Sequence, residues 1–115
     1  KAARAQIVAE GGVQAIVLGM QKHSADRAVQ TEGIASLGNL ALDQQVAPQL
    51  VAAGAIKVVV EGMHTLRDNV DVQREGCNTL GNIADSEACR ARLVEGGGVR
   101  AVLQSMRAHR SDGGE

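Results

Sequence analysis

Apolar residues recur along this chain in the steps of three and four that are typical of an amphipathic helix. The stripe that begins at Val13 occupies positions i, i+3, i+4 and i+7, and it returns in the same frame at Ile56 and Val99. The spacing predicts three helices that each bury one face. The residues on these faces are Val13, Ile16, Val17 and Met20, then Ile56, Val59, Val60 and Met63, then Val99, Val102, Leu103 and Met106.

The three helices belong to a longer internal repeat with a period of 43 residues. The segment VQTEGIASLGNLA at 29–41 returns as VQREGCNTLGNIA at 72–84, and glycines align at 11, 54 and 97. A fixed period of about 20 to 50 residues indicates a stacked array, in which each unit contacts only its neighbours. We therefore expect a single array over 1–115, made of a unit at 1–43, a unit at 44–86, and a partial unit at 87–115 that lacks its third helix.

Within each unit, a short helix is expected before the apolar stripe. Pro48 stands near the start of the second copy, where its missing N–H is tolerated. The aligned glycines supply the left-handed conformation that ends a helix and turns the chain. This first helix is predicted at 2–10, 45–53 and 88–96.

The third helix of each unit is predicted to be the repeated segment itself. A polar loop at 23–28 or 66–71 precedes it, and Asp26 or Asn69 in that loop is a candidate helix cap. A glycine inside a helix costs about 1 kcal/mol against alanine. Its recurrence at the same places in both copies, 33 and 38, then 76 and 81, therefore predicts close helix approach. The inward face is expected to hold Val29, Gly33, Leu37 and Leu40 in one copy and Val72, Gly76, Leu80 and Ile83 in the next.

The amino-acid composition limits what the core can be made of and where in the cell the chain is expected. Hydrophobic residues make up 44% of the chain and aromatic residues 0%, so the core must be aliphatic. The net charge is −1 without a run of like charge, which argues against a nucleic-acid tail or a polybasic membrane segment. No stretch approaches the roughly 18 apolar residues of a membrane span. Cys77 and Cys89 form neither a CxxC motif nor a dense framework, which favours a reducing, intracellular setting, cytoplasmic or nuclear.

Three helices per unit, the G-[GA]-[VI] step between the first two, and the Leu-Gly-Asn-[LI]-Ala run in the third resemble the armadillo repeat. The resemblance covers the whole chain. It implies an all-α, right-handed superhelix whose third helices line a concave groove that binds extended peptides. In this family an asparagine of the third helix typically holds the ligand backbone, and by likeness that role falls to Asn39 and Asn82.

The predicted groove extends one and two helical turns back from each asparagine. A carboxamide offers one acceptor and two donors, so it suits a peptide backbone whatever the ligand's side chains. Importin-alpha-type members carry a tryptophan one turn before the asparagine, and its absence here argues against binding of nuclear localisation signals. With Arg74 nearby, an acidic or neutral peptide is expected rather than a basic one. The groove positions are Thr31, Ala35 and Asn39 in one unit and Arg74, Asn78 and Asn82 in the next.

No constellation of residues predicts catalysis, a cofactor or a metal site. Cys77 and Cys89 take the places of aliphatic residues in the preceding unit, so both are expected to be small buried apolar residues. His23 and His109 would lie about two repeat layers apart, too far to share a metal. The chain is therefore not expected to be an enzyme.

The third unit is locally basic, with five arginines between Arg90 and Arg110 against the single acid Glu95. A solvated outer face is the expected role. Attraction of an acidic partner or of phosphates stays open as an alternative. The lack of aromatic residues to stack bases argues against single-stranded nucleic acid as a partner.

Two functions stay open after this reading. The first is a protein–protein interaction scaffold that binds an extended peptide in the groove. The second is a structural spacer or self-associating segment whose groove holds no peptide. In the partial unit, the stripe of Val99, Val102, Leu103 and Met106 lacks part of its cover, so we expect either a fragment of a longer array or copies that stack end to end.

Overall fold

The computed structural model describes residue 6 and residues 11–109, and this part of the chain is helical without any strand. The all-α prediction is confirmed. The predicted helix at 2–10 lies outside the described residues except for residue 6, which is helical. The elements are α2 (Gly12–Lys22), α3 (Arg27–Ala41), α4 (Ala47–Ala52), α5 (Ala55–Thr65), α6 (Val70–Ala84), the 3-10 turn η1 (Glu87–Cys89), α7 (Arg90–Glu95) and α8 (Gly98–Ala108).

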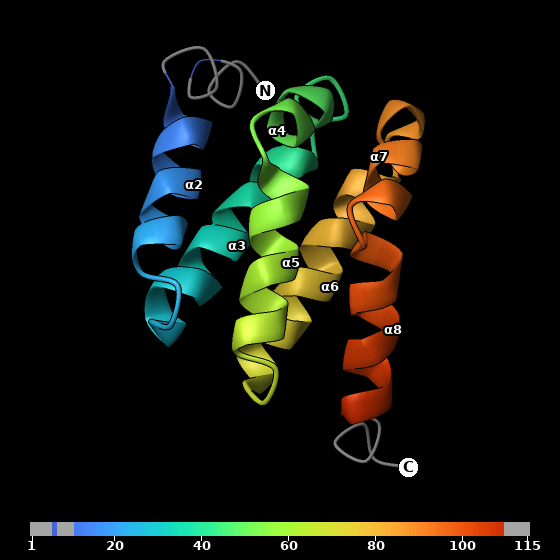
Figure 1. Ribbon diagram of the computed structural model, residues 1–115. Coiled ribbons are helices and arrows are strands. Elements are labelled where there is room, and N and C mark those ends of the chain that lie inside the picture. The colour runs from blue at the N-terminus through green and yellow to red at the C-terminus, as the bar shows by residue number, and fades with distance from the viewer. Residues whose placement is uncertain (1–5, 7–10, 110–115) are drawn as a thin grey trace.

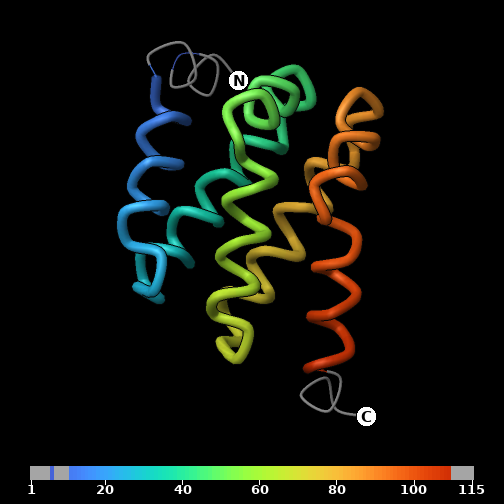
Figure 2. The backbone as a smooth tube through the Cα atoms, in the orientation of Figure 1, coloured from blue at the N-terminus to red at the C-terminus, as the bar shows by residue number. Residues whose placement is uncertain are grey.

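The helices follow the 43-residue period of the sequence. Helices α2, α5 and α8 each have 11 residues, and α3 and α6 each have 15. Figure 1 shows α2, α5 and α8 side by side in one layer and running in the same direction, with α3 and α6 in a second layer behind them. The short helices α4 and α7 lie at one end of both layers, as the tube in Figure 2 also shows.

Most of the residues that were predicted to start or end the helices do so in the structure. Glycines 11, 54 and 97 have φ values of 81°, 98° and 82°, and they are the positive-φ positions of the described chain. Pro48 lies in the first turn of α4. The Asp26 carboxylate accepts a hydrogen bond from the Val29 N–H at 3.1 Å, and the Asn69 side chain accepts one from the Val72 N–H at 2.9 Å. Each third helix begins at the residue after its cap, so both helices start within the stretches that were predicted to be loops.

One predicted helix takes a different form. The segment expected as a single helix at 88–96 is divided into the 3-10 turn η1 and the six-residue α7. Its counterpart α4 is likewise only six residues long, shorter than predicted. Both copies of the first helix bring the chain back to the glycine that precedes the next long helix, and they also bury Ala47, Leu50 and Val51 of α4 and Leu93 of α7 in the core.

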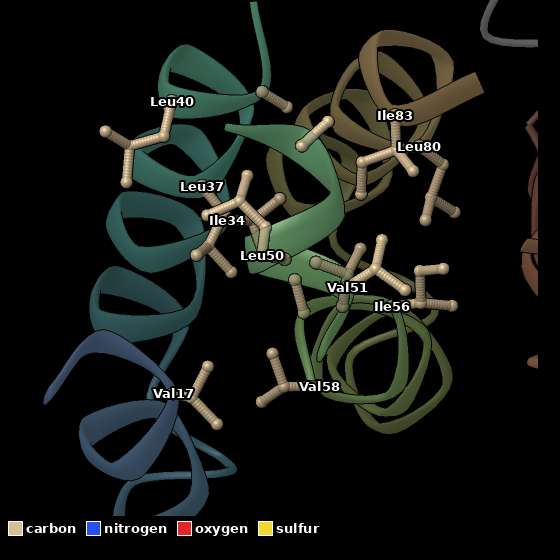
Figure 3. Packing of buried hydrophobic residues seen from close by; sticks show 14 of the residues in the cluster. Val17, Ile34, Leu37, Leu40, Leu50, Val51, Ile56, Val58, Leu80 and Ile83 are labelled. Carbon is tan, nitrogen blue, oxygen red and sulfur yellow. The ribbon is translucent and has the colours of Figure 1, made fainter. Parts of the chain in front are cut away.

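The core lies between the two layers. The stripes of α2 and α5 are buried or half-buried, and Figure 3 shows Val17 and Val58 pointing toward one another, with Ile34 and Leu37 close to Leu50. The stripe of α8 differs, because it has no third helix of its own unit among the described residues. Exposed fractions there are 45% for Val99, 46% for Leu103 and 62% for Met106. The expected gap in cover is confirmed, and Met106 is not the core residue that its frame predicted.

Three of the four glycines within α3 and α6 allow close packing. A Cβ built on Gly33 would lie 2.6 Å from the Met20 Cγ, and one on Gly76 would collide with the Met63 side chain in the same way. A Cβ on Gly38 would collide with Thr79 of the next unit. The prediction of close approach is wrong for Gly81, which has nothing within 4 Å of its built Cβ.

Candidate functional site

The predicted groove residues come from α3 and α6, which pack against each other between consecutive units. Each helix contributes three positions spaced by four residues, so they lie along one side of the helix. That side faces away from the inward stripe, which in α6 is buried at all four predicted positions. The six residues, which we call the polar face, are Thr31, Ala35, Asn39, Arg74, Asn78 and Asn82.

The polar face is accessible but uneven. Asn39, Arg74 and Asn78 are exposed, whereas Thr31, Ala35 and Asn82 are half-buried. The small Ala35 side chain leaves the middle of α3 without a polar group, while Asn78 places a carboxamide at the equivalent point of α6. All six predicted residues are therefore exposed or half-buried, each on the side of its own helix that is turned away from the inward stripe.

Several of these side chains already have partners. The Thr31 hydroxyl donates to the Arg27 carbonyl at 2.7 Å, within its own helix. The Arg74 guanidinium donates to the Asp71 carboxylate at 2.6 Å, in an ion pair whose side chains are 65% and 63% exposed. This pair offsets the charge of Arg74 on the polar face. An exposed pair of this kind stabilises a protein by only about 0 to 1 kcal/mol.

Asn82 joins the polar face to the contact between units. Its Nδ2 donates to the Gly38 carbonyl of α3 at 3.0 Å. One turn earlier, the Thr79 hydroxyl donates to the Ile34 carbonyl at 2.9 Å, and Thr79 is completely buried. These two bonds to backbone carbonyls hold α6 in one register on α3. The role of Thr79 was not predicted, although its counterpart Ser36 also carries a hydroxyl.

A second pair of polar residues was also missed by sequence reasoning. Gln30 and Gln73 are only 1% and 5% exposed, although their side chains are polar. Gln30 Nε2 donates to the Met20 carbonyl at 2.8 Å and to the His23 carbonyl at 3.1 Å. Gln73 Nε2 makes the same bonds, at 2.8 Å and 3.1 Å, to the carbonyls of Met63 and Leu66. The available signal was a glutamine in the same frame of both copies, one residue after an inward valine.

Two hollows lie between neighbouring helices of the layer formed by α2, α5 and α8, away from the polar face. The one between α2 and α5 has a volume of about 160 Å³, and its counterpart between α5 and α8 has about 440 Å³. A Cβ on Gly62 would lie 2.7 Å from the Gln30 Oε1, so a glycine there permits close packing. At the equivalent places beside the larger hollow stand Ser105, which carries that Cβ, and Ala101, which is smaller than its counterpart Val58. No residue of the polar face lines either hollow.

Other candidate chemistry is sparse in the part of the chain that the structure describes. No three histidine, cysteine, aspartate or glutamate side chains come together there in a way that could hold a metal. Cys89 is 1% exposed, as predicted, but Cys77 is only half-buried. Arg90 donates to the Ala84 carbonyl at 2.8 Å, so one of the third unit's arginines supports the end of α6. None of the described helices has both the length and the apolar character needed to cross a membrane.

Comparison with known proteins adds no relative. No family model matches the chain, no curated protein is significantly similar to it, and no solved structure matches its fold. The site must therefore be interpreted from its own geometry.

Proposed function

We propose that this chain is an interaction scaffold of the armadillo type, whose units wind into a right-handed superhelix and bind an extended peptide along the polar face. The observation that carries this proposal is the register between α3 and α6. The bonds from Thr79 to the Ile34 carbonyl and from Asn82 to the Gly38 carbonyl hold equivalent positions of the two helices at a constant offset. Exposed polar groups on a rigid scaffold are well suited to bind a ligand.

The two asparagines would contribute differently to a ligand. Asn39 is exposed and its carboxamide makes no hydrogen bond with the described residues, so both its acceptor and its donors can serve a peptide backbone. Asn82 spends one donor on Gly38 and keeps its Oδ1 and second N–H. Helices that pack about 8 to 10 Å apart, set against about 3.3 Å per residue of an extended peptide, would contact every second or third ligand residue.

Charge on the polar face favours a neutral peptide among the expected ligands. Arg74 is paired with Asp71, so it attracts an acidic ligand less strongly than an unpaired arginine would. Glu32, which follows Thr31 in the chain, is exposed and adds negative charge to α3. A basic ligand would lack the aromatic clamp that tryptophan provides in importin-alpha-type members, because this chain has no aromatic residue.

The test is selection of peptides from a random phage-displayed library on the 115-residue chain, followed by titration of the selected sequences. Asn39→Ala should weaken their binding about threefold to tenfold, the effect of losing a hydrogen bond worth about 0.5 to 1.5 kcal/mol. Gln14→Ala, at an exposed position of α2, is the matched control and should leave affinity unchanged. Asn82→Ala is a less clean variant, because it also removes the bond to Gly38.

A second function is supported by a separate observation, the exposed stripe of α8. It favours a structural spacer or self-associating segment whose polar face stays empty. If no selected peptide binds, or if selected peptides bind Asn39→Ala as tightly as the unchanged chain, this second function is the better account.

A further inference from the structure

A second accessible surface is formed by α6 and α8, which pack against each other, and it adjoins the polar face at Arg74, which lies one turn from Val70 and from Cys77 on α6. It is apolar where the polar face is not. Exposed fractions reach 62% for Met106 and 47% for Val70, values that are high for large apolar side chains. Apolar surface of this kind commonly marks an interaction site. We call it the end face, and its residues are Val70, Cys77 and Gly81 of α6 and Val99, Leu103 and Met106 of α8.

The internal repeat identifies what covers the equivalent surface one unit earlier. There, the place of Cys77 is held by Ile34, which is 0% exposed, and the place of Met106 is held by Met63, which is 3% exposed. The element that covers both is α6, because it packs on α3 of the preceding unit and on α5 of its own. The end face is therefore equivalent, one repeat later, to the surface that α6 covers.

Four contacts define how α6 covers that surface. Gln73 donates to the Met63 carbonyl at 2.8 Å, and Gly76 leaves room for the Met63 side chain. Thr79 and Asn82 donate to carbonyls of α3 at 2.9 Å and 3.0 Å. Apolar side chains between these positions fill the space behind them, namely Val72, Leu80 and Ile83.

We propose that the end face is a docking site for an amphipathic helix with the residue pattern of α6. Its glycine would admit the Met106 side chain, and its glutamine three residues earlier would reach the Met106 carbonyl. Its threonine and asparagine would donate to the carbonyls of Cys77 and Gly81, which stand where Ile34 and Gly38 stand one unit earlier. The open space around Gly81 suits such a close approach, because a threonine fills the equivalent space at Gly38.

A second copy of the chain fits the end face less well. Within the described residues, the glutamine, glycine and hydroxyl spacing occurs in α3 and α6 alone, and both helices are already built into their own units. A copy could offer one of them only by unfolding part of itself. The exposed side of α2 carries Gln14, Leu18 and Gln21, and neither glutamine is followed by a glycine three residues later.

The three methionines provide a direct test, since Met20 and Met63 are buried and Met106 is exposed. The probe is a synthetic peptide of residues 69–85 with Cys77→Ala, added to the full chain labelled with ¹³C at the methionine methyls. The Met106 resonance should shift and saturate at or below about 1 mM peptide, a modest affinity because an isolated short helix is only marginally stable. The Met63 resonance should stay in place, because α6 is not displaced.

Alkylation of the thiols gives a second readout in the same sample. Saturating peptide should slow the reaction of half-buried Cys77 at least about tenfold, since the docked helix excludes reagent in the way that α6 covers Ile34. Cys89 is buried and should stay unreactive throughout, as the internal control. The Asn39→Ala chain should bind this peptide normally, so failure of the polar-face proposal would not affect the result.

The matched control is the same peptide with Gly76→Val, which should bind at least about tenfold more weakly because its side chain would overlap with Met106. Equal binding of the two peptides would overturn the proposal, and so would an unmoved Met106 resonance. A shift at Met63 would mean that the peptide replaces α6 and would also overturn it. A Met106 resonance that moves on dilution without peptide would assign the end face to a second copy instead.

Discussion

Helices α5 and α8 start from the same sequence pattern and reach different environments. Both are 11 residues long, both follow a glycine in the left-handed conformation, and both carry the i, i+3, i+4, i+7 stripe. Met63 is nevertheless 3% exposed and Met106 62%, and Ile56 is 5% exposed against 45% for Val99. The amphipathic pattern determines which side of a helix needs cover, whereas the neighbouring helix determines whether that side is buried.

The other sides of α5 and α8 differ for a local reason. Each packs on the preceding second helix, and each meets a buried glutamine there. A Cβ on Gly62 would lie 2.7 Å from the Gln30 Oε1, whereas the equivalent residue of α8 is Ser105, and the hollow beside Gln73 is the larger of the two. The two hollows therefore differ in volume although the order of the helices is the same.

The largest contrast is expected from truncating the two methionines. Met63→Ala should lower the free energy of unfolding by about 2 to 5 kcal/mol, because it opens a cavity in the core. Met106→Ala should change it by no more than about 0.5 kcal/mol, as for other exposed positions. Urea unfolding of both variants measures the difference. A large loss for Met106→Ala would mean that the end face is covered in solution.

The buried glutamines sharpen the comparison at the next level. Gln73→Ala should cost about 1 to 3 kcal/mol, because it removes the side-chain donor to the buried Met63 carbonyl and leaves the Leu66 carbonyl with the Asn69 N–H alone. Gln104→Ala, at an exposed position of α8, is the control, and its free energy of unfolding should lie within about 0.5 kcal/mol of that of the unchanged chain. Thermal unfolding followed by circular dichroism would register both. If Gln73→Ala proved neutral, the hydrogen bonds would not be what ties the third helix to the second.

Much of the fold could be predicted because its determinants are local and occur twice or three times. The caps at Asp26 and Asn69 and the left-handed glycines act within a few residues of themselves, so each copy of the repeat checks the others. The errors arose where a neighbouring unit decides the outcome. Gly81 has the same frame as Gly38, but no helix crowds it among the described residues, whereas the exposure of Met106 follows from the partial unit that the period had already predicted.

The placement of the six candidate residues on their helices was predictable, whereas the hydrogen bonds they make were less so. Helical spacing was sufficient to put Asn39 and Asn82 on the same side of packed helices. The bond from Asn82 to Gly38 depends on how closely α6 approaches α3, which no pattern within one helix reveals. The pairing of Arg74 with Asp71 is an i, i+3 contact that could have been read from the sequence. Peptide binding by these residues stays a prediction.

The smallest expected effect is on the free energy of unfolding when a glycine of α6 is replaced by alanine. The sign of this effect should differ between the two glycines. Gly81→Ala should stabilise the chain by about 0.5 to 1 kcal/mol, because alanine favours the helix and its Cβ meets nothing within 4 Å. Gly76→Ala should destabilise it, because the same gain is outweighed by overlap with Met63, at about 1 to 3 kcal/mol for overpacking. Urea unfolding of both variants decides between local propensity and packing. Stabilisation by both would mean that Met63 moves aside freely, and destabilisation by both would mean that Gly81 already faces a partner, as it would if the end face were occupied.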